Sequence, residues 1–291
     1  MAQNSTDNRT VTVGVDGSDG SVTALRWALD HADQMGEIVP VMTFASGPFE
    51  YGFGTVTGST GSGEPYRSEA VMRLRRVLEA HAPGLVDRAT VVERRAGPGL
   101  VDAAAESELL VVGTRGWSSR IDLSIGSVGA YCARHSAVPV ALIPPEVPPV
   151  HERVNAVVGF DGSRNGRTAL RWTLTHLRPS ARVTVVEAIA GGGVVGEPLQ
   201  PSDQDAEAAA RNGLHDAVAH VLDELEIHPD VDLVVATGDP RAALPIAAAD
   251  ADVLVVGSRG HGVLDRLLLG SVAVALSHHP TVPTIVVPHD V

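Results

Sequence analysis

The chain has 291 residues, a length that predicts two domains rather than one. Its formal net charge is -13, from 35 Asp and Glu against 22 Lys and Arg, so nucleic acid and anionic membrane surfaces are not expected as partners. All 22 basic residues are Arg, which excludes a phosphate-binding Lys of the P-loop or kinase type and a Schiff-base Lys.

A single Cys, Cys132, excludes an intrachain disulfide framework and a Cys-based zinc cluster, and we expect it to be packed in a helix. The N-terminal MAQNSTDNR is polar and lacks the apolar core of a signal sequence, and no apolar run reaches membrane-spanning length. The chain is therefore expected to be soluble and cytoplasmic.

Strand and helix patterns alternate along the first half of the chain. In chain order they are strand Thr10–Val15, helix Val22–Ala32, strand Ile38–Phe44, helix Ser68–His81, strand Ala89–Glu93, helix Leu100–Ala105, strand Leu109–Val112, helix Ser127–His135 and strand Val138–Ile143. Continuous apolar runs such as LLVVG indicate strands that are buried on both faces, as in a parallel sheet. The alternation predicts an open, doubly wound α/β sheet with helices on both faces.

The second half repeats the first. VGVDGSDGSVTALRWAL begins at Val13 and matches VGFDGSRNGRTALRWTL, which begins at Val158, 145 positions later. LLVVGTRG ends at Gly116 and matches VLVVGSRG, which ends at Gly260, 144 positions later. Similar segments in the same order and at nearly the same spacing indicate a duplicated domain. The Pro-rich stretch PPEVPPVHER separates the copies, and we predict domains at 1–147 and 148–291.

A Gly-rich stretch follows the second strand of each copy, at 47–65 and at 190–203. This composition predicts loops rather than helices or strands. A loop at the carboxyl end of a sheet strand lies beside the binding crevice, so a lid is one interpretation, and plain disorder is the other.

Two features of each copy are expected to meet at the carboxyl end of the sheet, where open parallel sheets bind ligands. The first is Asp16, with its counterpart Asp161, at the end of the first strand. The second is the spacing G-x2-G-x9-G-S after the fourth strand, which begins at Gly113 in one copy and at Gly257 in the other. Glycines let backbone N–H groups approach phosphate oxygens, and the Gly-Ser pair opens a helix whose N-terminus favours an anion.

Each feature also has a purely structural interpretation. Asp-Gly-Ser favours turns, so Asp16 alone fits an Asx turn or a helix cap, and a glycine pair after a strand alone fits a turn. The complete spacing, present twice behind matching VVG strands, favours a phosphate-binding loop. Arg115 and Arg259 inside these loops fit either neutralisation of phosphate or exposure to solvent, and the residues do not decide between the two.

The V-G-x-D-G-S start, the G-x2-G-x9-G-S loop and the final V-P-V/T strand together resemble the universal stress protein family, specifically its tandem-domain, ATP-binding branch. The resemblance covers about 10–144 and 154–288, which is nearly the whole chain. It implies two tandem Rossmann-like domains of the adenine nucleotide α-hydrolase-like type, each with a five-stranded parallel sheet of order 3-2-1-4-5. It also implies ATP held without a Walker loop, in agreement with the absence of Lys. We expect Mg²⁺ to accompany the ATP.

The same resemblance implies a role for each motif residue. Asp16 and Asp161 would lie at the adenine and ribose of ATP, and Ala45 and Ala188, near the ends of the second strands, would meet adenine through their backbone. The loop residues would surround the ribose and the phosphates, namely Gly113, Gly116, Gly126, Ser127 and Val128 in the first copy and Gly257, Gly260, Gly270, Ser271 and Val272 in the second. Two ATP molecules per chain are expected.

The two copies differ before the fourth strand. Gly97 to Gly113 spans 16 positions, whereas Gly238 to Gly257 spans 19, which predicts a first copy shorter by about one helical turn. The shorter segment fits either a trimmed surface turn or a weakened first site.

Other enzyme classes find little support. The sequence has no G-x-S-x-G elbow and no G-x-G-x-x-G after either first strand, so neither a hydrolase triad nor a dinucleotide dehydrogenase is predicted. We assign no catalytic residue and no metal ligand.

Three functions are compatible with these residues. The preferred one is a regulatory module of stress or growth control in which ATP occupancy sets conformation or partner contacts, with hydrolysis slow or absent. The alternatives are a slow ATP hydrolase or nucleotide-transfer enzyme, and a scaffold that acts through its dimer surface with a vestigial nucleotide loop. Pairing of the two halves, a homodimer of whole chains and an unidentified protein partner are further expectations.

Overall fold

The computed structural model describes residues 9–45, 64–114, 127–147, 154–177, 180–189, 201–227, 229–260, 269–278, 280–289 and 291. It contains two compact units, one built on Met1–Val147 and the other on Pro148–Leu276 and Pro280–Val291. Each unit is described by itself.

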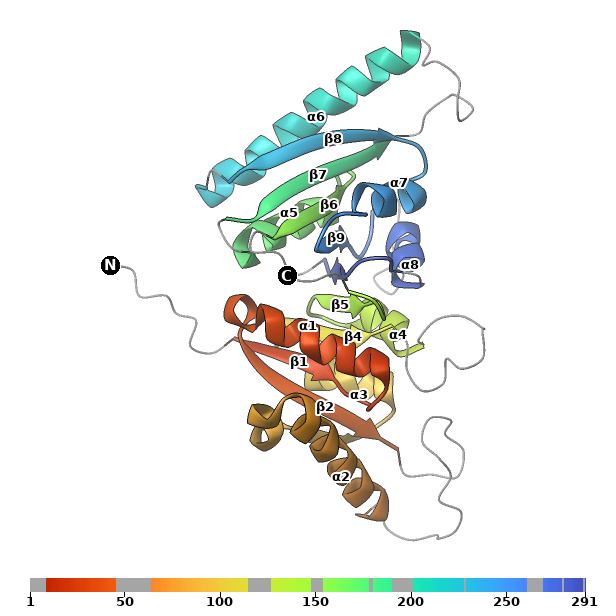
Figure 1. Cartoon of the computed structure of the whole chain (residues 1–291). Coiled ribbons are helices and arrows are strands. Elements are labelled where there is room, and N and C mark those ends of the chain that lie inside the picture. The colour runs from red at the N-terminus through yellow and green to blue at the C-terminus, as the bar shows by residue number, and fades with distance from the viewer. Residues whose placement is uncertain are drawn as a thin grey trace, which may run out of the picture. The chain divides into compact units, whose positions relative to one another are not determined.

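The sheet of the first unit is parallel, with the strand order β3-β2-β1-β4-β5 (Figure 1). Its strands are β1 (Thr10–Gly14), β2 (Glu37–Phe44), β3 (Thr90–Glu93), β4 (Leu109–Gly113) and β5 (Val140–Ile143). The residues of β4 and β5 are almost all buried, as their continuous apolar runs predict, whereas both ends of the edge strand β3 are exposed.

The helices of the first unit cover both faces of this sheet. The α1 helix (Asp19–Met35) contacts α2 (Glu64–His81), and α3 (Ala96–Ala103) contacts α4 (Ser127–His135). The strand order reverses direction between β1 and β4, and right-handed crossovers therefore put α1 and α2 on one face and α3 and α4 on the other. A short 3-10 helix, η1 (Pro83–Arg88), packs against α2 and β2 and was not predicted.

The second unit repeats this order as β8-β7-β6-β9-β10, again with parallel pairing throughout. Its elements in chain order are β6 (Asn155–Phe160), α5 (Arg164–His176), β7 (Arg182–Ile189), α6 (Pro201–Leu225), β8 (Val231–Thr237), α7 (Pro240–Ala247), β9 (Val253–Gly257), α8 (Ser271–His278) and β10 (Thr284–Val287) (Figure 1). The predicted fold class and the predicted strand order are confirmed in both units. The domain boundary between 147 and 148 stays a prediction.

A glycine in the first strand of each unit lets a helix pack closely on the sheet. A Cβ built at Gly14 would lie 2.9 Å from Cδ1 of Leu100 in α3, and one at Gly159 would lie 2.8 Å from Cδ1 of Leu244 in α7. Both leucines are buried. Leu100 and Leu244 therefore occupy equivalent positions in the two cores, 144 positions apart.

This equivalence corrects the predicted difference in length between the copies. The α3 and α7 helices each have eight residues, and Ala96 stands 17 positions before Gly113, as Pro240 does before Gly257. Gly97 lies inside α3 and corresponds to Arg241, so it is not the counterpart of Gly238. The first unit is therefore not short of a helical turn, and Gly97 and Gly238 occupy different places in the fold.

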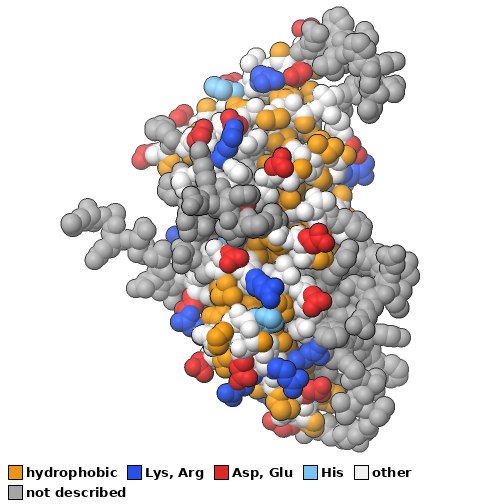
Figure 2. All heavy atoms as spheres, viewed as in Figure 1, with side chains coloured by type: hydrophobic (Ala, Val, Ile, Leu, Met, Phe, Trp, Pro, Cys, Tyr) orange, Lys and Arg blue, Asp and Glu red, His pale blue; other side chains and the backbone are white. Residues whose placement is uncertain are grey.

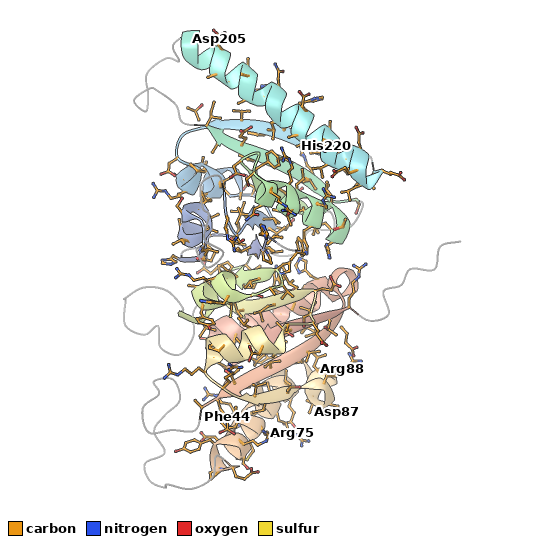
Figure 3. The ribbon with its side chains drawn as sticks, turned by 180° about the vertical axis from the view of Figure 1, so that it is seen from behind. Phe44, Arg75, Asp87, Arg88, Asp205 and His220 are labelled. Atoms are coloured by element: carbon orange, nitrogen blue, oxygen red, sulfur yellow. The ribbon has the colours of Figure 1, made fainter. Side chains whose placement is uncertain are left out.

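The limits of the predicted loops also change. The α2 helix begins at Glu64 and α6 at Pro201, so the ends of the stretches 47–65 and 190–203 are helical. From Asp205, which is labelled in Figure 3, to Gly213 the side chains of α6 are largely exposed, and the buried face begins at Leu214. The remainder of both loops, and therefore the lid interpretation, lies outside the described residues.

Cys132 is fully buried in α4, as predicted. None of the helices formed by the described residues combines the length and the apolar character that crossing a bilayer requires. On the face drawn in Figure 2, acidic and basic side chains are interspersed over both units.

Candidate functional site

The segment after the first strand forms the same turn in both units. The backbone N–H of Ser18 donates to Oδ1 of Asp16 at 2.9 Å, and that of Ser163 donates to Oδ1 of Asp161 at 3.0 Å. The glycine between them has a positive φ in each case, 80° at Gly17 and 74° at Gly162, which glycine adopts without strain. One oxygen of each aspartate therefore closes an Asx turn, which is the structural interpretation that the sequence left open.

The serine of this turn begins the following helix. Oγ of Ser163 accepts a hydrogen bond from the N–H of Gly166 at 3.1 Å and caps α5, and Oγ of Ser18 accepts from the N–H of Ser21 at 3.2 Å at the start of α1. Asp161 and Asp16 consequently stand beside helix N-termini, where backbone N–H groups favour negative charge. Asp161 is exposed and Asp16 is half-buried.

The first glycine of each predicted loop has a packing role. A Cβ at Gly113 would lie 2.4 Å from the carbonyl oxygen of Gly20, and one at Gly257 would lie 2.8 Å from that of Asn165. Backbone at this distance cannot move aside easily, so glycine is required where the fourth strand passes the start of α1 or α5. The structure thus explains Gly113 and Gly257 by packing, and their predicted contact with ribose or phosphate stays a prediction.

In the second unit, the loop after β9 meets the turn after β6. A Cβ at Gly260 would lie 2.5 Å from Oδ2 of Asp161, the carboxylate oxygen that the Asx turn does not use. The N–H of Gly270 donates to the carbonyl of Ser258 at 2.8 Å, and a Cβ at Gly270 would lie 3.5 Å from the backbone N of Gly260. The two ends of the loop and the aspartate therefore converge at the carboxyl edge of the sheet, as predicted.

The N-terminus of α8 follows this convergence directly. Ser271 is its first residue and is exposed, and the half-buried Val272 follows it. In the first unit, Val128 is half-buried near the start of α4, which begins at Ser127. The described residues do not include Gly116, Gly126 or the side chain of Ser127. Their predicted proximity to Asp16 therefore stays a prediction.

The predicted base-contacting residues lie at the ends of the second strands. The last residue of β2 is Phe44, whose side chain is labelled in Figure 3. Ala45 follows it directly and is half-buried. Ala188 is half-buried in β7 and pairs in register with Ala236 of β8. Both positions stand at the same edge of their sheet as the aspartate turn, because all the strands run parallel.

Two residues near the candidate sites were missed by the sequence analysis. The guanidinium of Arg73, from α2, lies against the turn at Gly17. The hydroxyl of Ser258 is buried and finds no hydrogen-bond partner within the described part of the chain, whereas its counterpart Thr114 donates to the carbonyl of Ile143 at 3.2 Å. No local sequence pattern signals either arrangement, because both depend on contacts between elements distant in the chain.

A metal centre finds no support among the residues that the structure describes. They contain no group of three or more His, Cys, Asp or Glu side chains that is close enough to hold a metal ion.

These observations define the class of protein. Each unit is a doubly wound, Rossmann-like α/β domain, and in the second unit glycine backbone, a carboxylate and a helix N-terminus meet at the switch point of the sheet. The chain belongs to the universal stress protein family, whose family model matches residues 7–144 and 154–288.

Similar proteins extend over the whole tandem arrangement. A universal stress protein of Mycolicibacterium smegmatis is 26% identical over 300 aligned residues, which cover 99% of this chain and 99% of that protein. One from Mycobacterium tuberculosis is 30% identical over 320 aligned residues, covering 97% of this chain and 96% of the relative. The crystal structure of a universal stress protein from Archaeoglobus fulgidus matches with a TM-score of 0.62 at 18% identity, covering 96% and 98% of the two chains, which supports the fold.

Proposed function

We propose that each unit binds one molecule of ATP at the carboxyl edge of its sheet, and that nucleotide occupancy regulates the protein in stress or growth control. The observation that carries this proposal is the convergence of Gly260, Gly270 and Asp161 beside the N-terminus of α8. Backbone N–H groups of glycines and of a helix N-terminus bind phosphate, and a carboxylate next to them accepts hydrogen bonds from ribose hydroxyls or from the amino group of adenine.

The residue roles in this proposal follow the order of the strands. In the first unit the strands that carry Ala45, Asp16 and Gly113 are adjacent, in the order β2-β1-β4. The phosphates belong at the glycine loop after β4, so the base and ribose belong over the ends of β1 and β2. By the same order we assign Ala188 and Asp161 of the second unit to the nucleoside end, and Gly260 and Gly270 to the phosphate end.

Regulation rather than rapid hydrolysis fits the chemistry of the site. The chain has no Lys to neutralise the transferred phosphoryl group. Asp161 and Asp16 each use one oxygen in an Asx turn, which suits a binding role better than proton abstraction from an attacking water. Mg²⁺ enters the proposal as an ion carried by the triphosphate.

The test is the nucleotide content of the purified chain. We expect denaturation to release intact ATP, identified by chromatography and mass, at close to two per chain. Gly260→Val should lower this to about one, because a side chain there would collide with Asp161. The matched control is Gly213→Val in α6, where an added Cβ meets nothing within 4 Å.

Three outcomes would contradict the proposal. The first is release of ADP alone from the purified chain, together with multiple turnover of ATP that is abolished by Asp16→Ala and Asp161→Ala. This result would establish an enzyme. No nucleotide, followed by no binding in a calorimetric titration with ATP and Mg²⁺, would establish that the loops are vestigial. An unchanged stoichiometry in Gly260→Val would mean that the second unit binds its nucleotide elsewhere.

A further inference from the structure

Arg73 reaches from α2 to the turn that follows β1. Its Nε would lie 3.1 Å, and its Nη2 3.6 Å, from a Cβ built at Gly17. The same Cβ would lie 3.3 Å from Cγ2 of Val77, one helical turn further along α2. The guanidinium therefore lies against the backbone of the turn directly after Asp16, at a glycine whose φ of 80° disfavours other residues.

The position of α2 decides which end of the site Arg73 approaches. The helix packs on β2 and β3, the strands on the side of Ala45, away from the glycine loop after β4. The phosphate-binding features belong to β4 and α4. Arg73 consequently stands at the nucleoside end of the site.

The second unit has no arginine at this position. Ala70 and Leu74 form the buried face of α2, and Leu214 and Val218 form that of α6, each 144 positions later. At the same interval, the counterpart of Arg73 in α6 is Ala217, which is half-buried. The two candidate sites therefore differ in one cationic side chain at the nucleoside end.

We propose that Arg73 is a wall of the nucleoside subsite in the first unit, where its planar guanidinium packs on the purine ring, and that Ala217 leaves this wall open in the second unit. The inference rests on the proposed ATP sites. Arginine packs on aromatic faces through its flat, weakly hydrated cation, which a lysine ammonium reproduces poorly. The contact involves the base and not the phosphates, so it contributes equally to adenosine, ADP and ATP.

The experiment isolates the first site in the full chain with the background substitution Gly260→Val. Calorimetric titrations with adenosine, ADP and ATP compare Arg73, Arg73→Ala and Arg73→Lys in that background. Arg76→Ala, at an exposed position of the same helix, is the matched control. We expect Arg73→Ala to weaken binding of all three ligands by a common factor of about five. Arg73→Lys should remain close to Arg73→Ala, and Arg76→Ala should change nothing.

A reciprocal variant tests the same wall in the second unit. With the first site disabled by Gly116→Val, Ala217→Arg is expected to strengthen binding of adenosine and ATP by a similar factor of about five. This gain cannot arise from damage to the fold, because a destabilised unit would bind more weakly.

The outcomes separate this inference from the proposed function. If the Gly260→Val chain with Arg73 intact binds no ATP, the proposed function fails for the first unit and the inference fails with it. If that chain binds ATP and Arg73→Ala binds equally well, only the inference is overturned. A loss confined to ADP and ATP, or full recovery in Arg73→Lys, would also overturn it, because either result identifies a contact through charge to the phosphates.

Discussion

Asp161 shows how a single side chain serves both structure and a candidate site. Its Oδ1 accepts the N–H of Ser163 and closes the turn, while its Oδ2 faces Gly260 across the edge of the sheet. A turn residue and a ligand residue are usually treated as alternatives. Here one oxygen of the carboxylate closes the turn and the other faces the glycine loop, so the structural role is compatible with the proposed ligand role.

The low reactivity expected of the Cys132 thiol follows from its burial. It is fully buried in α4, and this burial raises the pKa of its thiol to about 12. Because the thiolate is the reactive species, we expect no reaction of the folded chain with a disulfide reagent at pH 8, and one thiol per chain after unfolding in urea. Rapid labelling of the folded chain would show that α4 opens readily.

Asp239 carries a pH-dependent contribution to stability. Its side chain caps α7 by accepting the N–H of Arg241 at 2.9 Å, and the hydrogen bond from the Arg241 guanidinium lowers the pKa of Asp239 to about 2. An aspartate in the unfolded chain titrates near pH ~3.9. Because the folded pKa is the lower of the two, the stabilisation is complete above about pH 4 and is lost as the pH falls towards 2.

We therefore expect Asp239→Asn to lower the urea midpoint of unfolding at pH 7 and to make little difference near pH 2. Arg95 holds the equivalent position before α3, without a side-chain cap. A gap between wild type and Asp239→Asn that persists at pH 2 would rule out the carboxylate as its cause.

At the scale of elements, two serines of the second unit have opposite environments. Ser163 caps α5 and accepts from Gly166, whereas the hydroxyl of Ser258 is buried and finds no hydrogen-bond partner among the described residues. A helix cap stabilises, and a buried hydroxyl without a partner costs free energy. The same substitution at the two sites should therefore act in opposite directions.

Ser163→Ala is expected to lower the free energy of unfolding by about 1 kcal/mol. Ser258→Ala should leave it unchanged or raise it by up to about 1 kcal/mol. Urea denaturation of the two variants, followed by circular dichroism, makes the comparison. A clear loss of stability in Ser258→Ala would mean that its hydroxyl does have a partner.

At the scale of the whole molecule, the chain consists of two units with the same strand order and different details. The edge strand β3 has four residues and is flanked by η1, whereas β8 has seven. The α6 helix begins well before the position that matches the start of α2. The two units need not unfold together, so each requires its own probe.

Trp27 and Trp172 supply these probes, because each is buried in the core of one unit. In a chain that keeps Trp172 alone, through Trp27→Phe and Trp117→Phe, we expect ATP at a hundredfold excess over Kd to raise the free energy of unfolding by about 2.7 kcal/mol. Gly260→Val should abolish this increase, whereas Gly116→Val should leave it. If neither substitution affects it, ATP stabilises the second unit from a site other than the one proposed.

The sequence by itself determined the duplicated α/β fold, the parallel pairing of the strands and the meeting of Asp161 with the glycine loop, whereas the strand order was implied by the resemblance to the family. These features follow from local patterns, since buried parallel strands are continuously apolar and their carboxyl ends share one edge of the sheet. Only the tertiary structure showed that Leu100 matches Leu244, that Gly113 packs against Gly20, and that Arg73 reaches Gly17. Each of these depends on how closely two elements distant in the chain approach each other, and no pattern within either element records that distance.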